Sequence, residues 1–279
     1  MREIFAEEII EKVKNAAIKS NVELSKEMLT ALKNGIKEEE SDIGKEILSC
    51  LIENAEIAKR ERIPICQDTG IVTIFVEIGQ EVYIRGGSLY SALEEGIRKG
   101  YKEGYLRKSV CHPITRKNTN DNTPIITHID IVPGSKLIIW IMPKGGGAEN
   151  VSKLYMLLPT DTWNEIKAKI LDTIKLAGAS ACPPIIVGIG IGGNFETAPL
   201  LAKKALLRPV GSRNNNLELD NIERELLRDI NNTGIGPQGL GGRVTALAVH
   251  INTMPCHIAS LPLAINIQCH ANRWIKIEI

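Results

Sequence analysis

The chain has 279 residues, of which 43% are hydrophobic and 24% charged, a composition typical of a globular protein with a substantial core. Its 34 basic and 33 acidic residues give a net charge of +1, which argues against a nucleic-acid or membrane surface, and the 4% aromatic content argues against base stacking. The charged N-terminus predicts no signal peptide, so the six cysteines are expected to be reduced thiols in the cytoplasm.

Residues 1–60 have the spacing of amphipathic helices. The predicted buried faces are Ile9, Ile10, Val13 and Ala17, then Met28, Leu29, Leu32 and Ile36, then Ile43, Ile47, Leu51 and Ala55. Ser25 and Ser41 are suitable N-caps for the second and third helices. Pro64 predicts that the helical region ends just before Cys66.

Strand and helix patterns alternate after residue 60. Strands are predicted at 71–78, 125–132, 136–142, 185–189 and 244–251, with 125–132 and 136–142 as a pair around Pro133-Gly134. Helices are predicted at 88–104, 162–176, 196–207 and 221–230. The expected fold is therefore mixed α/β (α+β): a helical N-terminal subdomain, 1–60, followed by a helix-covered mixed β-sheet region, 61–279.

Three cysteines stand in unusual contexts, Cys66 in CQDTG, Cys182 in ACPP and Cys269 in QCHANR. They lie 116 and 87 residues apart, so a shared ligand would have to be gathered by the whole fold. Cys182 and Cys269 lie in segments without charged side chains, 176–195 and 244–272, which predicts interior surroundings or ordinary core cysteines. No short Cys-x-x-Cys pair is present, which disfavours zinc and electron-transfer clusters.

Other motifs have two interpretations each. Gly188-x-Gly190-x-x-Gly193 matches a dinucleotide fingerprint, but the acidic residue expected about twenty positions later is missing, and close packing explains the glycines equally well. Arg107 could clamp a carboxylate or simply end a helix, and the glycines after Lys144 could bind an anion or form a turn. His257 could be a core histidine or a proton donor.

Taken together, these segments resemble the alpha subunit of the iron–sulfur (class I) fumarate hydratases and the related tartrate dehydratases. The matching stretches, in order, are 66–70 (CQDTG), 105–109 (YLRKS), 144–148 (KGGGA), 181–184 (ACPP), 192–199 (GGNFETAP) and 257–273, which ends in CHANR.

The resemblance implies that region 61–279 binds a four-iron, four-sulfur ([4Fe–4S]) cluster. Cys66, Cys182 and Cys269 would be its ligands and would leave one iron open to substrate. The family further implies roles for five other residues. Gln67 and Asp68 would face the substrate, Arg107 would bind a substrate carboxylate, Gly146 would donate a backbone N–H, and His257 would relay or orient a proton. Cys50, Cys111 and Cys256 have no part in the pattern and are interpreted as structural.

The resemblance also implies a partner. Fused members of the family continue into a C-terminal domain that supplies the catalytic base, whereas this chain ends ten residues after Cys269. A separate beta subunit is therefore expected, in an α2β2 hetero-oligomer. The predicted reaction is reversible hydration of fumarate to L-malate, a step of the tricarboxylic acid cycle. The alternatives are a tartrate dehydratase alpha subunit, a nucleotide-dependent oxidoreductase and a non-catalytic scaffold.

Overall fold

The computed structural model describes all residues, 1–279, and the chain divides into two compact units. Unit 1 consists of residues 1–24, 54–146 and 273–279, and unit 2 of residues 25–53 and 147–272. These units do not coincide with the predicted division at residue 60, because the N-terminal helices are shared between them. No helix combines the length and the apolar character needed to cross a membrane. The mixed α/β class is confirmed.

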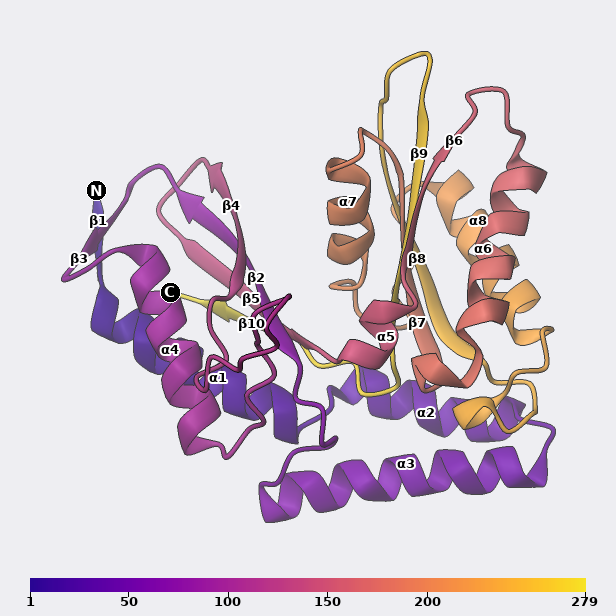
Figure 1. Cartoon of the computed structure of the whole chain (residues 1–279), viewed down its shortest axis with the longest axis horizontal. Coiled ribbons are helices and arrows are strands. Elements are labelled where there is room, and N and C mark those ends of the chain that lie inside the picture. Colours follow the sequence, from indigo (N-terminus) through magenta and orange to yellow (C-terminus); the bar gives the residue numbers. More distant parts are fainter. The chain divides into compact units, whose positions relative to one another are not determined.

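Unit 1 is a four-stranded sheet covered by two helices, with a small parallel pair of strands beside them (Figure 1). Its elements are β1 (Arg2–Phe5), α1 (Ala6–Val22), β2 (Ile71–Gly79), β3 (Val82–Arg85), α4 (Leu89–Glu103), β4 (Ile126–Val132), β5 (Leu137–Lys144) and β10 (Ile275–Glu278). The sheet order is β10-β5-β2-β4, and β1 pairs with β3.

The predicted pairing of residues 125–132 with 136–142 is wrong. The strands exist, but β2 lies between them, parallel to β4 and antiparallel to β5. The short turn after β4 therefore passes over the end of β2. The prediction that residues 1–60 are all helical also fails at Arg2–Phe5, which pairs with Val82–Arg85. A local pattern cannot show that a distant strand inserts between two neighbours.

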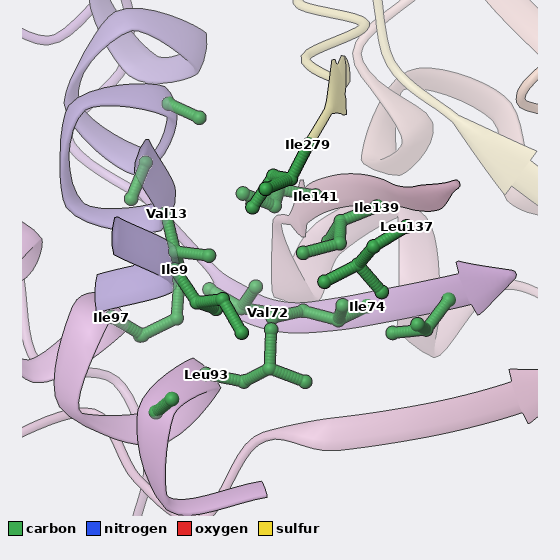
Figure 2. Close-up of a cluster of buried hydrophobic side chains, with 14 of the residues drawn as sticks. Ile9, Val13, Val72, Ile74, Leu93, Ile97, Leu137, Ile139, Ile141 and Ile279 are labelled. Carbon is green, nitrogen blue, oxygen red and sulfur yellow. The ribbon is translucent and has the colours of Figure 1, made fainter. Parts of the chain in front are cut away.

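The core of unit 1 is formed where α1 and α4 cover the sheet, as Figure 2 shows. The labelled side chains come from α1, α4, β2, β5 and the residue after β10: Ile9, Val13, Val72, Ile74, Leu93, Ile97, Leu137, Ile139, Ile141 and Ile279. Gly96 lets the two helices approach, since a Cβ there would lie 2.7 Å from the Val13 side chain. The predicted inner face of the first helix is thus confirmed at Ile9 and Val13.

Unit 2 is a second four-stranded sheet, of order β6-β9-β7-β8, with α7 on one face and α6 and α8 on the other (Figure 1). Its elements are α2 (Lys26–Glu38), α5 (Gly146–Asn150), β6 (Lys153–Leu157), α6 (Trp163–Ala177), the 3-10 turn η1 (Gly178–Ala181), β7 (Ile185–Gly192), α7 (Thr197–Ala205), α8 (Leu217–Asn231), the 3-10 turn η2 (Pro237–Gly239), β8 (Ala246–Met254) and β9 (Leu261–Gln268). Helix α3 (Asp42–Glu61) contributes to both units.

The glycines of β7 are packing residues. A Cβ on Gly188 would lie 2.2 Å from the Ala202 carbonyl oxygen, and one on Gly190 would lie 2.1 Å from the Ala198 carbonyl oxygen. Both glycines lie inside the strand and face α7, so the helix backbone fills the space that a phosphate would need. The structure thus favours the packing interpretation of this motif over the dinucleotide one.

Polar side chains of β8 tie α7 to the same face of the sheet. Asn252 donates from Nδ2 to the Leu201 carbonyl at 3.1 Å, and His250 Nδ1 lies 3.1 Å from the Ala205 carbonyl oxygen. Burial, together with the nearby Arg208 guanidinium, lowers the pKa of His250 to about 4. His250 is therefore a neutral, hydrogen-bonded core histidine at neutral pH.

The predicted caps are present. The Ser25 hydroxyl accepts from the Met28 N–H at 3.2 Å, and the Ser41 hydroxyl accepts from the Gly44 N–H at 3.2 Å. Ala55 of the predicted face of the third helix is buried, but the rest of the inner face is shifted by one position, since Ile43 is 59% exposed and Leu48 is fully buried. This helix has more apolar residues than fit on one face, so their spacing is compatible with more than one inner face.

Glu39, between α2 and α3, is a buried carboxylate that anchors the loop before β8. It is 3% exposed and accepts from the N–H groups of Glu40, Ser41, Arg243 and Val244 at 2.7–3.0 Å. Burial acts to raise the pKa of Glu39, but these four backbone donors outweigh it and hold the pKa below its ordinary value. The ionised form is therefore the one that folding favours.

Replacing Glu39 by glutamine is expected to destabilise the fold by about 2 kcal/mol at pH 7. The glutamine side chain has an NH₂ group in place of one carboxylate oxygen, and this NH₂ would face backbone N–H groups that need an acceptor. A lowered pKa stabilises the folded state above the unfolded pKa, and this stabilisation is lost as the pH falls through the folded value. The difference in free energy of unfolding between wild type and Glu39→Gln should therefore become smaller below about pH 4. Urea unfolding at several pH values measures it, and a difference that stays constant to pH 3 would contradict the assignment.

Candidate functional site

The CQDTG segment forms a tight loop directly before β2 in unit 1. The Cys66 sulfur accepts from the Asp68 N–H at 3.4 Å, and Asp68 Oδ1 accepts from the Gly70 N–H at 3.0 Å. Gly70 has φ +73°, and a Cβ there would lie 2.3 Å from the Lys144 carbonyl oxygen, so only glycine fits. Gln67 is exposed, and its Oε1 lies 3.5 Å from the Cys66 sulfur.

Buried side chains hold this loop from below. The Tyr101 hydroxyl donates to the Thr69 carbonyl at 2.7 Å, and Arg273 Nη2 donates to the Asp68 carbonyl at 2.9 Å while its Nη1 donates to Asn21 Oδ1 at 3.1 Å. Arg273 is 2% exposed and Tyr101 fully buried. Sequence reasoning assigned neither a role, although Arg273 closes the CHANR motif and directly follows a long charge-free segment.

The Gly146 N–H points to Asp68. It donates to Asp68 Oδ2 at 2.7 Å, so both carboxylate oxygens are fixed by backbone donors. A Cβ on the preceding Gly145 would lie 3.0 Å from the same carboxylate oxygen. The glycine run therefore presents an N–H to an anion, as its composition suggested, and that anion is the side chain of Asp68.

Arg107 lies beside the same loop, in the segment after α4. Its carbonyl accepts from the Thr69 hydroxyl at 3.0 Å, and its side chain is exposed. The helix ends at Glu103, so the interpretation of Arg107 as a helix-ending residue does not hold. Unit 1 thus brings together four predicted substrate-facing residues, Gln67, Asp68, Arg107 and Gly146, around one predicted ligand, Cys66.

Unit 2 brings the other two predicted ligands to one end of its sheet. Cys182 lies just before β7 and Cys269 just after β9, and these strands are antiparallel neighbours with Ile186 opposite Gln268. The His270 N–H donates to the Cys182 carbonyl at 3.4 Å, which ties the two cysteine segments together. Both cysteines are partly exposed, so the predicted interior surroundings are found only in part.

The donor chemistry of these segments fits an iron–sulfur cluster. None of the six cysteines forms a disulfide, and Cys66, Cys182 and Cys269 are all partly exposed. Thiolates are the ligands that such clusters use. No group of three or more His, Cys, Asp and Glu side chains is placed together to hold a metal ion. The pair in unit 2 and Cys66 in unit 1 therefore remain a proposed ligand set.

His257 lies away from these cysteines within unit 2. It belongs to the exposed loop between β8 and β9, the yellow loop at the top of Figure 1, where its Nδ1 accepts from the Ala259 N–H at 3.1 Å. The whole of β9 separates this loop from Cys269, a length of about 26 Å for an eight-residue strand. The structure therefore does not bring His257 to the Cys182–Cys269 end of the sheet.

Comparison with known proteins places the chain among the hydro-lyases. A family model described as fumarate hydratase (Fumerase) matches residues 10–278, and the chain belongs to this family. This confirms the resemblance noted in the sequence.

Relatives match over most of their length. A protein of Methanocaldococcus jannaschii named "Putative L(+)-tartrate dehydratase subunit alpha" is 44% identical over 273 residues, which cover 95% of this chain and 94% of that protein. The L(+)-tartrate dehydratase subunit alpha of Escherichia coli strain UTI89 is 33% identical over 240 residues, 84% of this chain and 78% of the relative. The K12 strain protein of the same name is 32% identical over the same length.

Proposed function

We propose that this chain is the alpha-type subunit of an iron–sulfur hydro-lyase that adds or removes water on a small dicarboxylate in the cytoplasm. The observation that carries the proposal is the family match over residues 10–278. The thiol pair Cys182 and Cys269, at one end of the unit 2 sheet, supports it. A separate beta subunit is the proposed partner, in an α2β2 assembly, because the relatives are named as alpha subunits.

In this proposal Cys66, Cys182 and Cys269 hold a [4Fe–4S] cluster. When bound, such a cluster supplies an open iron that acts as a Lewis acid toward a hydroxyl and a carboxylate oxygen. The remaining work falls to side chains of unit 1. The exposed Arg107 guanidinium binds one substrate carboxylate through paired N–H donors, and the Gln67 amide orients the substrate.

Asp68 is the proposed catalytic group of this chain. Its carboxylate is held by the Gly70 and Gly146 N–H groups, which fix its direction before substrate arrives. Asp68 would then hold or transfer a proton at the substrate hydroxyl. The proposed Gly146 contact with substrate requires that its N–H exchange Asp68 for a substrate oxygen.

His257 has a conditional role. His257 lies at the opposite end of the unit 2 sheet from Cys182 and Cys269. It could therefore relay a proton only at the site of another chain in the assembly. Replacing His257 by alanine in an isolated subunit should therefore leave cluster binding unchanged, and a role in substrate turnover would appear only in the assembled enzyme.

Two substrates are candidates. The sequence favours hydration of fumarate to L-malate, whereas the names of the relatives favour dehydration of L(+)-tartrate. L-malate and L(+)-tartrate are both four-carbon dicarboxylates, and tartrate carries one hydroxyl more than malate. Discrimination should depend on groups that pair with that hydroxyl, some of which would come from the beta subunit.

The test is co-purification with the cognate beta subunit, followed by anaerobic assays with malate, fumarate and L(+)-tartrate. We expect turnover of one dicarboxylate by the complex and little by the chain alone. Full activity of the isolated chain would contradict the need for a partner. A complex that contains iron and sulfide but turns over none of the three substrates would contradict the hydro-lyase proposal for these dicarboxylates.

A further inference from the structure

Cys182 has a strained backbone. It follows η1 with φ +52° and ψ +65°, the left-handed conformation that is unfavourable for a residue with a Cβ. Its N–H donates to the Ala179 carbonyl at 2.9 Å, and Pro183 follows directly. Strain of this kind persists only where surrounding contacts impose it, and it is concentrated at functional sites.

Two residues distant in sequence, Gln238 and His270, hold the backbone at Cys182 in this conformation. His270 Nδ1 lies 3.1 Å from the Cys182 carbonyl oxygen, and the His270 N–H donates to the same oxygen at 3.4 Å. Gln238 donates to the Pro183 carbonyl through its backbone N–H at 2.9 Å and through Nε2 at 2.6 Å. The Cys182 carbonyl is thus held by His270, and the Pro183 carbonyl by Gln238.

The two side chains also meet each other. Gln238 Nε2 lies 3.1 Å from His270 Nδ1. A carbonyl oxygen cannot donate, so the contact to Cys182 requires a proton on His270 Nδ1, and Gln238 Nε2 then serves the Pro183 carbonyl. Gln238 is itself left-handed, at φ +52°. Next to it, a Cβ on Gly239 would lie 2.5 Å from the Ala179 side chain, so η2 presses closely on η1.

We propose that Gln238 and His270 are positioning residues that hold Cys182 in its left-handed conformation and so aim its thiolate at the cluster. The inference rests on the proposed function and extends it to two residues to which the sequence analysis assigned no role. The partners behind a metal ligand set its orientation, and their loss typically lowers metal affinity by about 10- to 100-fold. Neither residue belongs to a hydrophobic core cluster, so we expect the chain to fold without the pair.

The test compares anaerobically reconstituted full-length wild type with His270→Ala, His270→Asn and Gln238→Ala. Iron and sulfide per chain, loss of cluster absorbance to a chelator, and the electron paramagnetic resonance spectrum of the reduced cluster are measured, together with thermal unfolding of the cluster-free chains. We expect the alanine variants to lose iron about 10- to 100-fold faster, with an altered spectrum and a nearly unchanged apoprotein midpoint. His270→Asn should restore most of the retention, because its Nδ2 can donate where Nδ1 did.

Matched controls are His112→Ala and Gln80→Ala, exposed residues of unit 1 that should leave retention unchanged. The inference is overturned if His270→Ala keeps the wild-type retention and spectrum, or if His270→Asn fails as badly as alanine. Iron loss that only parallels a lower apoprotein midpoint would also overturn it. Wild type that takes up no iron would instead refute the cluster itself, and this inference with it.

Discussion

Cys182→Ser is expected to abolish cluster binding while leaving the fold intact. The chain should drop from about four irons to less than one, because serine removes one of only three thiolates. The activity of the complex should fall on the order of 100- to 1000-fold, since the group that stabilises developing charge is lost. The same is expected of Cys66→Ser and Cys269→Ser. Iron and sulfide analysis after anaerobic reconstitution measures the first effect and the dehydration assay the second.

The other cysteines provide the controls. Cys50 and Cys256 are exposed and Cys111 is partly exposed, and none belongs to the proposed ligand set. Their serine variants should keep iron, sulfide and activity near wild type. If Cys111→Ser loses the cluster and Cys66→Ser keeps it, the ligand assignment is wrong even though a cluster is present.

Gly190→Ala is expected to produce the largest loss of stability. The new methyl group would lie 2.1 Å from the Ala198 carbonyl oxygen and 2.7 Å from the Ala202 nitrogen. Both are backbone atoms of α7, so relief requires moving the helix off the sheet. We expect a loss of about 3 kcal/mol and a midpoint lower by about 6–12 °C in thermal unfolding.

Gly211→Ala is the matched control in the same unit. Its Cβ would meet nothing within 4 Å, but its φ of +87° is unfavourable for alanine. It should therefore lose only about 1–2 kcal/mol of stability through backbone strain. Equal losses in the two variants would mean that α7 can shift freely, and the packing explanation for the β7 glycines would fail.

Local signals predicted the elements of this fold well. Ser25, Ser41, Ser88 and Thr162 each precede a helix and cap it or form its capping box. Apolar runs located β2 and β7, whose side chains are all buried or half-buried. Caps and apolar runs are local in sequence, so they can be recognised without knowledge of the fold.

Pairing between distant strands was beyond those signals. The insertion of β2 between β4 and β5 depends on contacts among three separate segments. Strand β9 was not predicted, although its large apolar residues Leu261, Leu263, Ile265 and Ile267 alternate with Pro262, Ala264, Asn266 and Gln268. The large apolar residues form the face packed in the core with α6 and α8, so the strand period was present in this segment.

The site shows the same division. The resemblance to a known family proposed the three thiols and Asp68 as site residues, whereas the partner of the Gly146 N–H and the support from Tyr101 and Arg273 required coordinates. The position of His257, at the opposite end of a strand from Cys269, could not be read from a spacing of twelve residues. A strand carries such residues apart as readily as a turn brings them together.

The sheet of unit 1 has a consequence for biosynthesis. Strand β10 pairs with β5, and Ile279 is buried in the same core as Ile9. Unit 2, by contrast, uses nothing after residue 272. On a ribosome, unit 2 can therefore fold first, while β5 keeps an unpaired edge until residues 273–279 have been synthesised. Nascent chains should be most prone to aggregate in that interval, and a chaperone that shields strand edges would act then.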